Sequence, residues 1–148
     1  MKTLLIAITF VLMLVSSNAF SSDDVITTCQ GNTTMTLNII DNKFNIVATI
    51  TDSNGKKISK ELLSGTVFSD SVEAKDEDIK IYQDSLTKAQ LINTKLVSGQ
   101  SLLIESSKDY ERYFYHLMVD DKDNLHAFII PVSNPRLTYL GSVDACKN

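Results

Sequence analysis

The sequence has 148 residues, of which 43% are hydrophobic and 22% are charged, and its formal net charge is −4. This length and composition are typical of one globular domain with a real core and exclude a disordered chain. The mild acidity argues against nucleic acid and against an anionic membrane surface as partners.

Residues 1–19 have the three parts of a secretory signal peptide. Lys2 gives a basic start, an apolar run of about a dozen residues follows, and the small residues Ser17 and Ala19 precede a cleavage point after Ala19. The run is shorter than the roughly 20 residues that a membrane-spanning helix needs, and no later segment is long enough either. We therefore expect an exported protein, periplasmic or extracellular, with residues 20–148 as one all-β domain. Loss of Lys2 leaves 13 basic against 18 acidic residues, a formal charge of −5.

The sequence contains two cysteines, Cys29 and Cys146. In an exported chain a single pair is most simply a disulfide. By the chain-entropy estimate, closing so long a loop contributes about 4–5 kcal/mol. A metal pair or a redox couple would need closer spacing or more ligands.

The clearest strand pattern lies in residues 33–51, where apolar and polar residues alternate on both sides of Asp41-Asn42. With these two residues as the turn, apolar side chains face each other across the strands on one side. A three-residue loop at residues 53–55 adds a third strand, so that residues 33–63 form a meander with one buried face. The predicted pairs are Ile39 with Phe44, Leu37 with Ile46, Met35 with Ala48, Ile50 with Ile58, and Ile46 with Leu62.

The middle of the chain has weaker patterns. We interpret residues 62–68 as a strand bent at Gly65, residues 69–78 as an acidic surface loop, and residues 79–82 as a short strand. The loop lacks the ligand spacing of an EF-hand. Residues 87–97 fit either a helix that begins with Thr87 and Gln90 as a capping box or a strand. Shorter apolar segments at residues 101–105 and 136–142 complete the set of predicted strands.

Residues 110–132 carry the densest apolar pattern, in two alternating runs on either side of an acidic turn. A three-residue loop at residues 121–123 sets apolar residues opposite each other on both faces. It pairs Leu117 with Ala127, Tyr115 with Ile129 and Phe114 with Ile130. We expect this hairpin to be central, with its odd-numbered face in the core because that face is aliphatic and uncharged.

The even-numbered face of the same hairpin carries Arg112, His116 and His126, whose burial without partners would be costly. We therefore expect this face to stay at least partly accessible and to offer an apolar surface formed by Phe114, Met118, Phe128 and Ile130. Aromatic side chains together with arginine are typical of binding hot spots. The predicted binding residues are Arg112, Phe114, His116, His126 and Phe128.

The two histidines lie diagonally across the hairpin in this register, where side chains can still meet. Such a pair binds a metal only with a third ligand, and it can also form a pH-sensitive patch. The simpler interpretation is two unrelated histidines on a half-exposed sheet. We predict no metal and no cofactor.

The catalytic templates G-x-S-x-G, H-E-x-x-H, C-x-x-C and the Gly-rich phosphate loop are all missing from the sequence. A hydrolase with a carboxylate dyad stays open as an alternative, because such a dyad is defined by distance and not by spacing. A structural envelope protein that only self-associates is a further alternative. Two Ser-Gly pairs, in LLSGTVF and LVSGQSL, resemble over a few residues the Ser-Gly segment of periplasmic lysozyme inhibitors, which are disulfide-closed β-barrels. A resemblance of this length assigns no family.

Short strands at about 8–12-residue spacing predict a single-domain antiparallel β-barrel or β-sandwich of about eight strands, closed by one disulfide. The expected function is non-catalytic binding through an apolar sheet face. The expected partner is a protein, as for an enzyme inhibitor, or a small apolar ligand.

Overall fold

The structure is a computed structural model, and it describes residues 23–73, 75–88, 91, 93–134 and 136–147. The predicted signal peptide, residues 1–19, lies outside the described residues. Eight strands and one α-helix make up the described part, with a short 3₁₀ helix near its end. The strands are β1 (Asp23–Gln30), β2 (Thr33–Ile40), β3 (Lys43–Thr51), β4 (Lys57–Glu73), β5 (Leu96–Ser106), β6 (Arg112–Asp120), β7 (Leu125–Pro131) and β8 (Thr138–Ser142). The helices are α2 (Asp76–Lys88) and η1 (Asp144–Lys147).

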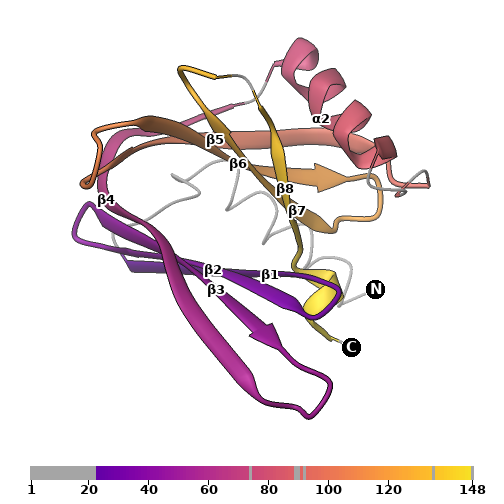
Figure 1. The fold of residues 1–148 in the computed structure, drawn as a ribbon. Coiled ribbons are helices and arrows are strands. Elements are labelled where there is room, and N and C mark those ends of the chain that lie inside the picture. The colour runs from indigo at the N-terminus through magenta and orange to yellow at the C-terminus, as the bar shows by residue number, and fades with distance from the viewer. Residues whose placement is uncertain (1–22, 74, 89–90, 92, 135, 148) are drawn as a thin grey trace.

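Each strand pairs antiparallel with the next one along the chain, and β1 also pairs with β8, so that the eight strands form one closed ring (Figure 1). This confirms the all-β prediction, and the closure decides against two separate sheets. The ring closes narrowly, because among the described residues β1 and β8 have one pair in register, Cys29 with Ser142.

The β2–β3 hairpin has the predicted register, with Leu37 opposite Ile46 and Met35 opposite Ala48. Its two turn residues, Asp41 and Asn42, have φ angles of 49° and 62°. Positive φ at both central positions is the geometry of a type I′ turn, whose twist matches that of the flanking strands. The local turn chemistry therefore fixes this register.

The third strand of the meander follows the prediction only in part. Ile50 pairs with Ile58 as expected, but a bulge shifts the register, so that Ile46 pairs with Leu63 and not with Leu62. Ile50 and Ile58 are exposed, which contradicts their predicted burial. The reason is that the β3–β4 hairpin projects beyond the ring, as Figure 1 shows.

Strand β4 changes its pairing partner near Gly65, the residue at which the sequence predicted a bend. Residues up to Thr66 pair with β3, and residues from Gly65 onward pair with β5. A Cβ on Gly65 would lie 1.9 Å from the carbonyl oxygen of Glu105. Only glycine lets the two backbones approach so closely.

The predictions for residues 69–82 are wrong. Strand β4 runs on to Glu73, and α2 begins at Asp76, so the expected acidic loop and the short strand at residues 79–82 do not form. The three acidic residues at positions 76–78 occupy the first helical turn, where the helix dipole favours negative charge. Tyr82 and Leu86 lie four residues apart on one helix face and are both buried.

Residues 87–97 do not form one helix or one strand; they include the end of a helix and the start of a strand. Helix α2 ends at Lys88 and strand β5 begins at Leu96. Thr87 does not begin a helix, because its hydroxyl donates a hydrogen bond back to the carbonyl of Gln83 within the last turn of α2. Gln90 lies outside the described residues.

The central hairpin has the predicted register in full, including Leu117 opposite Ala127 and Phe114 opposite Ile130. Asp123, the last residue of the three-residue loop, has a φ of 65°, as expected for a turn followed by a bulge. The odd-numbered face of the hairpin packs inside the ring. It joins a core that also contains Leu37, Ile39, Phe44, Ile46, Leu102, Ile104 and Leu140.

The even-numbered face is accessible only at one end: Arg112 is exposed and Phe114 and Ile130 are half-buried, whereas the rest of the face is buried, against the prediction. Helix α2 lies on the outside of the ring over this face (Figure 1), and together they form a second apolar core. Met118 and Phe128 are 0% exposed, and His116 and His126 are 5% exposed. The missed helix is one cause, because α2 covers this face and its Tyr82 is a hydrogen-bond partner of His116, while the partners of His126 come from β6 and β8.

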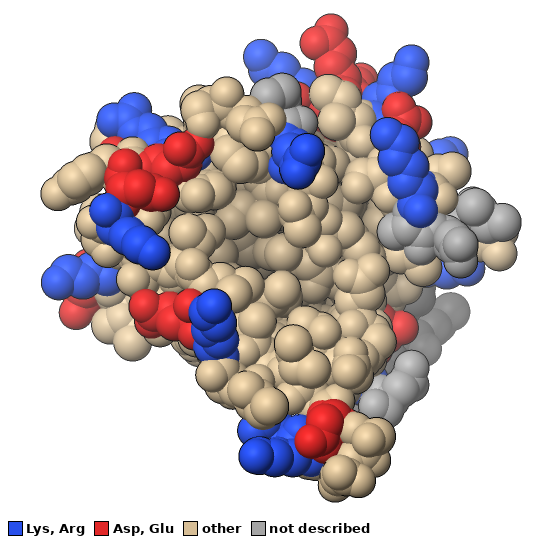
Figure 2. Space-filling model, in the orientation of Figure 1, with Lys and Arg blue, Asp and Glu red and all other residues tan. Residues whose placement is uncertain are grey.

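Cys29 and Cys146 form the predicted disulfide, with their Cα atoms 5.0 Å apart. The bond joins the end of β1 to η1, beside the point where β1 meets β8. On the face seen in Figure 2, charged side chains of both signs lie around the edge and uncharged residues line a hollowed centre. None of the described helices is long and apolar enough to cross a membrane.

Candidate functional site

His116 is held between helix α2 and strand β5 by both of its ring nitrogens. The Tyr82 hydroxyl lies 2.5 Å from Nε2, and the Ser101 hydroxyl lies 2.5 Å from Nδ1. Burial penalises the charged imidazolium and lowers the pKa of His116 to about 4, although the negative charge of Asp78 acts in the opposite direction. His116 is therefore neutral at pH 7, and one nitrogen donates while the other accepts.

His126 lies in a separate hydrogen-bonded chain on the same face of the hairpin. Its Nε2 is 2.9 Å from Oδ2 of Asp120, and its Nδ1 is 2.8 Å from the Tyr139 hydroxyl. The chain joins three strands, since Asp120 ends β6, His126 lies in β7 and Tyr139 lies in β8. Strand pairing alone brings these residues together.

Asp120 holds both the histidine and the hairpin loop. Its Oδ1 accepts hydrogen bonds from the backbone N–H groups of Lys122 and Asn124, each 2.9 Å long. Burial by itself would raise the pKa of Asp120, but the hydrogen bonds from His126 and from these two backbone groups outweigh it and hold the pKa below its usual value. The carboxylate is therefore ionised and fixed in place.

Tyr139, at the other end of the chain, keeps its proton. Burial raises the pKa of its phenol to about 12; the negative charge of Asp120 adds to this effect and a hydrogen bond from Ser142 opposes it. A phenol with this pKa is a hydrogen-bond donor at neutral pH and not a nucleophile.

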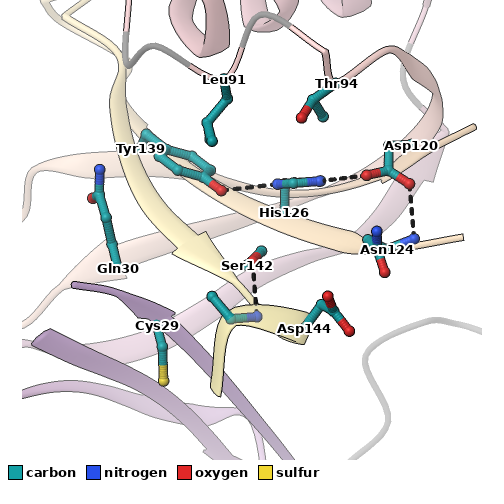
Figure 3. Close-up of a pocket in the computed structure, with 11 residues that line it drawn as sticks. Cys29, Gln30, Leu91, Thr94, Asp120, Asn124, His126, Tyr139, Ser142 and Asp144 are labelled. Carbon is teal, nitrogen blue, oxygen red and sulfur yellow. Dashed lines mark hydrogen bonds and ion pairs between the residues drawn. The ribbon is translucent and has the colours of Figure 1, made fainter. Parts of the chain in front are cut away.

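A cavity of about 340 Å³ lies beside this chain, at the end of the ring where β1 and β8 meet. Figure 3 shows His126 between Asp120 and Tyr139 in a row, with Leu91 and Thr94 on one side of the row and Ser142 and Asp144 on the other. The lining residues come from β1, β6, the β6–β7 loop, β7, β8, η1 and the segment after α2. They are Cys29, Gln30, Leu91, Thr94, Asp120, Asn124, His126, Tyr139, Ser142, Asp144 and Ala145.

The charge of this lining is negative. Asp120 and Asp144 are carboxylates, and the described lining residues include no lysine or arginine. Asp144 lies at the exposed rim, where Lys147 approaches it at 3.7 Å. An exposed pair at this distance is weak. The cavity therefore combines a buried, fixed carboxylate with an accessible one, and the neutral donors and acceptors of Asn124, Gln30 and Ser142 lie around them.

Of the five predicted binding residues, only His126 lines this cavity. His116 and Phe128 are buried under α2. Phe114 is half-buried on the outer face, and Arg112 lies 3.8 Å over the Phe68 ring and 3.0 Å from a Glu105 oxygen. The two histidines share no partner, and the described residues contain no group of three possible metal ligands.

Sequence reasoning missed Asp120, Asn124, Tyr139 and Asp144 as members of one site. Asp120 and Asn124 were visible only as turn residues, and Tyr139 only as part of a strand. Comparisons of the chain with protein-family models, with curated proteins and with solved structures find no match.

Proposed function

We propose that this chain is an exported, non-catalytic binding protein whose cavity takes a positively charged amine or guanidinium group. The group belongs to a small polar molecule or to a lysine or arginine side chain of a protein partner. The observation that carries the proposal is the 340 Å³ cavity with carboxylates as its charged lining and no lysine or arginine among the described lining residues. A volume of this order suits a small ligand.

The chemistry of the lining favours a hydrogen-bond donor. Carboxylates only accept hydrogen bonds when ionised, and Asp120 is ionised. An ammonium or guanidinium ion carries several donors and no acceptor, so it complements this lining and a carboxylate ligand does not. The small apolar ligand expected from the sequence fits less well, because Met118 and Phe128 of the sheet face that would have received it are buried under α2.

Two features support export. Residues 1–19 have the composition of a signal peptide, and the Cys29–Cys146 disulfide is of a kind that persists in oxidising compartments such as the periplasm or the extracellular space.

Binding is favoured over the alternative of a carboxylate-dyad hydrolase. A general acid must carry a proton at the working pH, whereas Asp120 is held ionised by three hydrogen bonds. His126 has no free ring nitrogen, because Asp120 and Tyr139 occupy both. The polar groups beside the cavity are thus fixed in place, as a preorganised binding site requires.

The proposal is tested by NMR titration of the exported, disulfide-bonded protein with butylamine and, separately, with butyrate. These probes have similar size and opposite charge. Butylamine should shift the backbone amide signals of Asn124, Ser142 and Asp144, and butyrate should not. Equal shifts with both probes, or none with butylamine, would overturn the proposal.

A further inference from the structure

A second hollow lies on the outer face of β2, β3 and β4 and shares no lining residue with the cavity at His126. Its volume is about 380 Å³. The strand register places Asn38 opposite Asn45, and Asn45 opposite Ser64, so these three side chains lie in a row across the three strands. Glu61 also lines the hollow and approaches the middle of this row.

A directed chain of hydrogen bonds orders the polar groups in this hollow. Nδ2 of Asn38 donates to Oδ1 of Asn45 over 2.8 Å, and Nδ2 of Asn45 donates to Oε2 of Glu61 over 3.3 Å. The two bonds leave one amide oxygen on Asn38, one N–H on each amide and the second oxygen of Glu61, and no described residue takes these up. Both donors and acceptors are therefore open along the row.

The charges in the hollow cancel. Lys43 lies on one side of the asparagine row and Glu61 on the other, and both line the hollow. The net charge of Lys43 and Glu61 is zero, so the hollow favours neither a cation nor an anion. Ile40, also in the lining, is 62% exposed and gives the hollow an apolar wall.

We propose that this hollow binds a neutral, polyhydroxylated ligand of the saccharide class. A sugar hydroxyl both donates and accepts, so neighbouring hydroxyls match a row that offers amide N–H, amide oxygen and carboxylate groups together. The C–H face of a sugar ring packs against Ile40. The amides are already oriented by Glu61, so little side-chain freedom is lost when the ligand binds. This site is independent of the amine site proposed above.

The test follows the side-chain NH₂ signals of Asn38 and Asn45 by NMR while maltotriose or N-acetylchitotriose is added to the exported protein. At least one trisaccharide should shift both pairs of signals. Asn45→Leu removes the centre of the chain and should weaken binding of that trisaccharide about tenfold or more, since the hydrogen bonds of the Asn45 amide are lost. Thr49→Val, on the same face beyond the hollow, is the matched control and should leave the affinity unchanged.

Asn38→Ala provides a second variant, and it should also weaken binding, whereas butylamine should still shift the signals of Asn124 and Asp144 in both variants. Two results would overturn the inference. One is that neither trisaccharide moves the asparagine signals. The other is that Asn45→Leu, folded as judged by its amide spectrum, binds as tightly as the parent protein.

Discussion

Gly141 lies so close to Cys29 that a Cβ on Gly141 would be 2.4 Å from the Cys29 carbonyl oxygen. This contact is at the seam where β1 meets β8, and it is reinforced one residue later by the pairing of Cys29 with Ser142. Gly141 also has a φ of 108°, which side-chain-bearing residues rarely adopt. The closure of the ring therefore depends on a glycine as well as on the disulfide.

Gly141→Ala should destabilise the protein by about 2 kcal/mol or more, because it adds both backbone strain and a steric clash at the seam. Urea unfolding measures the change. Gly31→Ala is the matched control, since Gly31 also has a positive φ, of 61°, but has nothing within 4 Å of its would-be Cβ. If both variants lose the same stability, the close approach to Cys29 is unimportant.

The disulfide itself should be complete in protein produced in an oxidising compartment. Mass spectrometry of unreduced material should find the mass of two hydrogens missing, and free thiols would contradict this assignment. The double variant Cys29→Ser/Cys146→Ser should lose about 2–5 kcal/mol, because the bond spans 117 residues and restricts the unfolded chain.

Phe128→Ala should cost about 3–5 kcal/mol of stability, as for a core phenylalanine. Its ring is 0% exposed and lies 5.3 Å from the Tyr82 ring of helix α2 and 5.1 Å from the Tyr139 ring. Leu117→Ala, on the opposite face of the hairpin, should cost about 2–5 kcal/mol. A cost below about 1 kcal/mol for Phe128→Ala would show that α2 does not cover this face in solution.

His116 should make stability depend on pH in a defined window. Its pKa is about 4 in the folded protein and 6.5 in the unfolded chain, so between these values the unfolded chain binds more protons. Stability is then full above about pH 6.5 and falls by up to about 1.4 kcal/mol per pH unit on acidification. Asp120, with a folded pKa below its usual value of 3.8, contributes only at lower pH.

Urea unfolding measures this dependence at a series of pH values from about 7 to about 4, the range in which His116 binds more protons in the unfolded chain than in the folded protein. His116→Gln keeps a donor and an acceptor but does not titrate, so it should flatten the dependence. An equally steep dependence in His116→Gln would show that other groups cause it.

The parts of the fold that could be predicted from the sequence are those fixed by neighbouring residues. The type I′ turn at Asp41-Asn42 and the loop at residues 121–123 each set the register of two adjacent strands, and both registers are confirmed. The disulfide also followed from simple counting, because only one pairing of two cysteines exists.

Helix α2 was missed because Ile79-Lys80-Ile81-Tyr82 alternates over four residues like a strand, and the helical period is visible only when Leu86 is included. Because the helix was missed, the sheet face that it covers was predicted to be a binding surface. A local sequence pattern does not show which element covers a sheet face. The Asp120–His126–Tyr139 chain was out of reach for a similar reason: its members meet only through the pairing of β6, β7 and β8.

Calorimetric titration with butylamine tests the proposed function most directly when three variants are compared with the parent protein. Asp144→Asn should weaken binding about fivefold, which corresponds to about 1 kcal/mol for an exposed ion pair. Lys147→Gln should strengthen binding, because it removes the cation that lies 3.7 Å from Asp144. Asp84→Asn, which removes the same charge from the exposed side of α2, should leave the affinity unchanged. Equal affinities for all four proteins, or equal weakening by Asp144→Asn and Asp84→Asn, would contradict an amine site in the cavity.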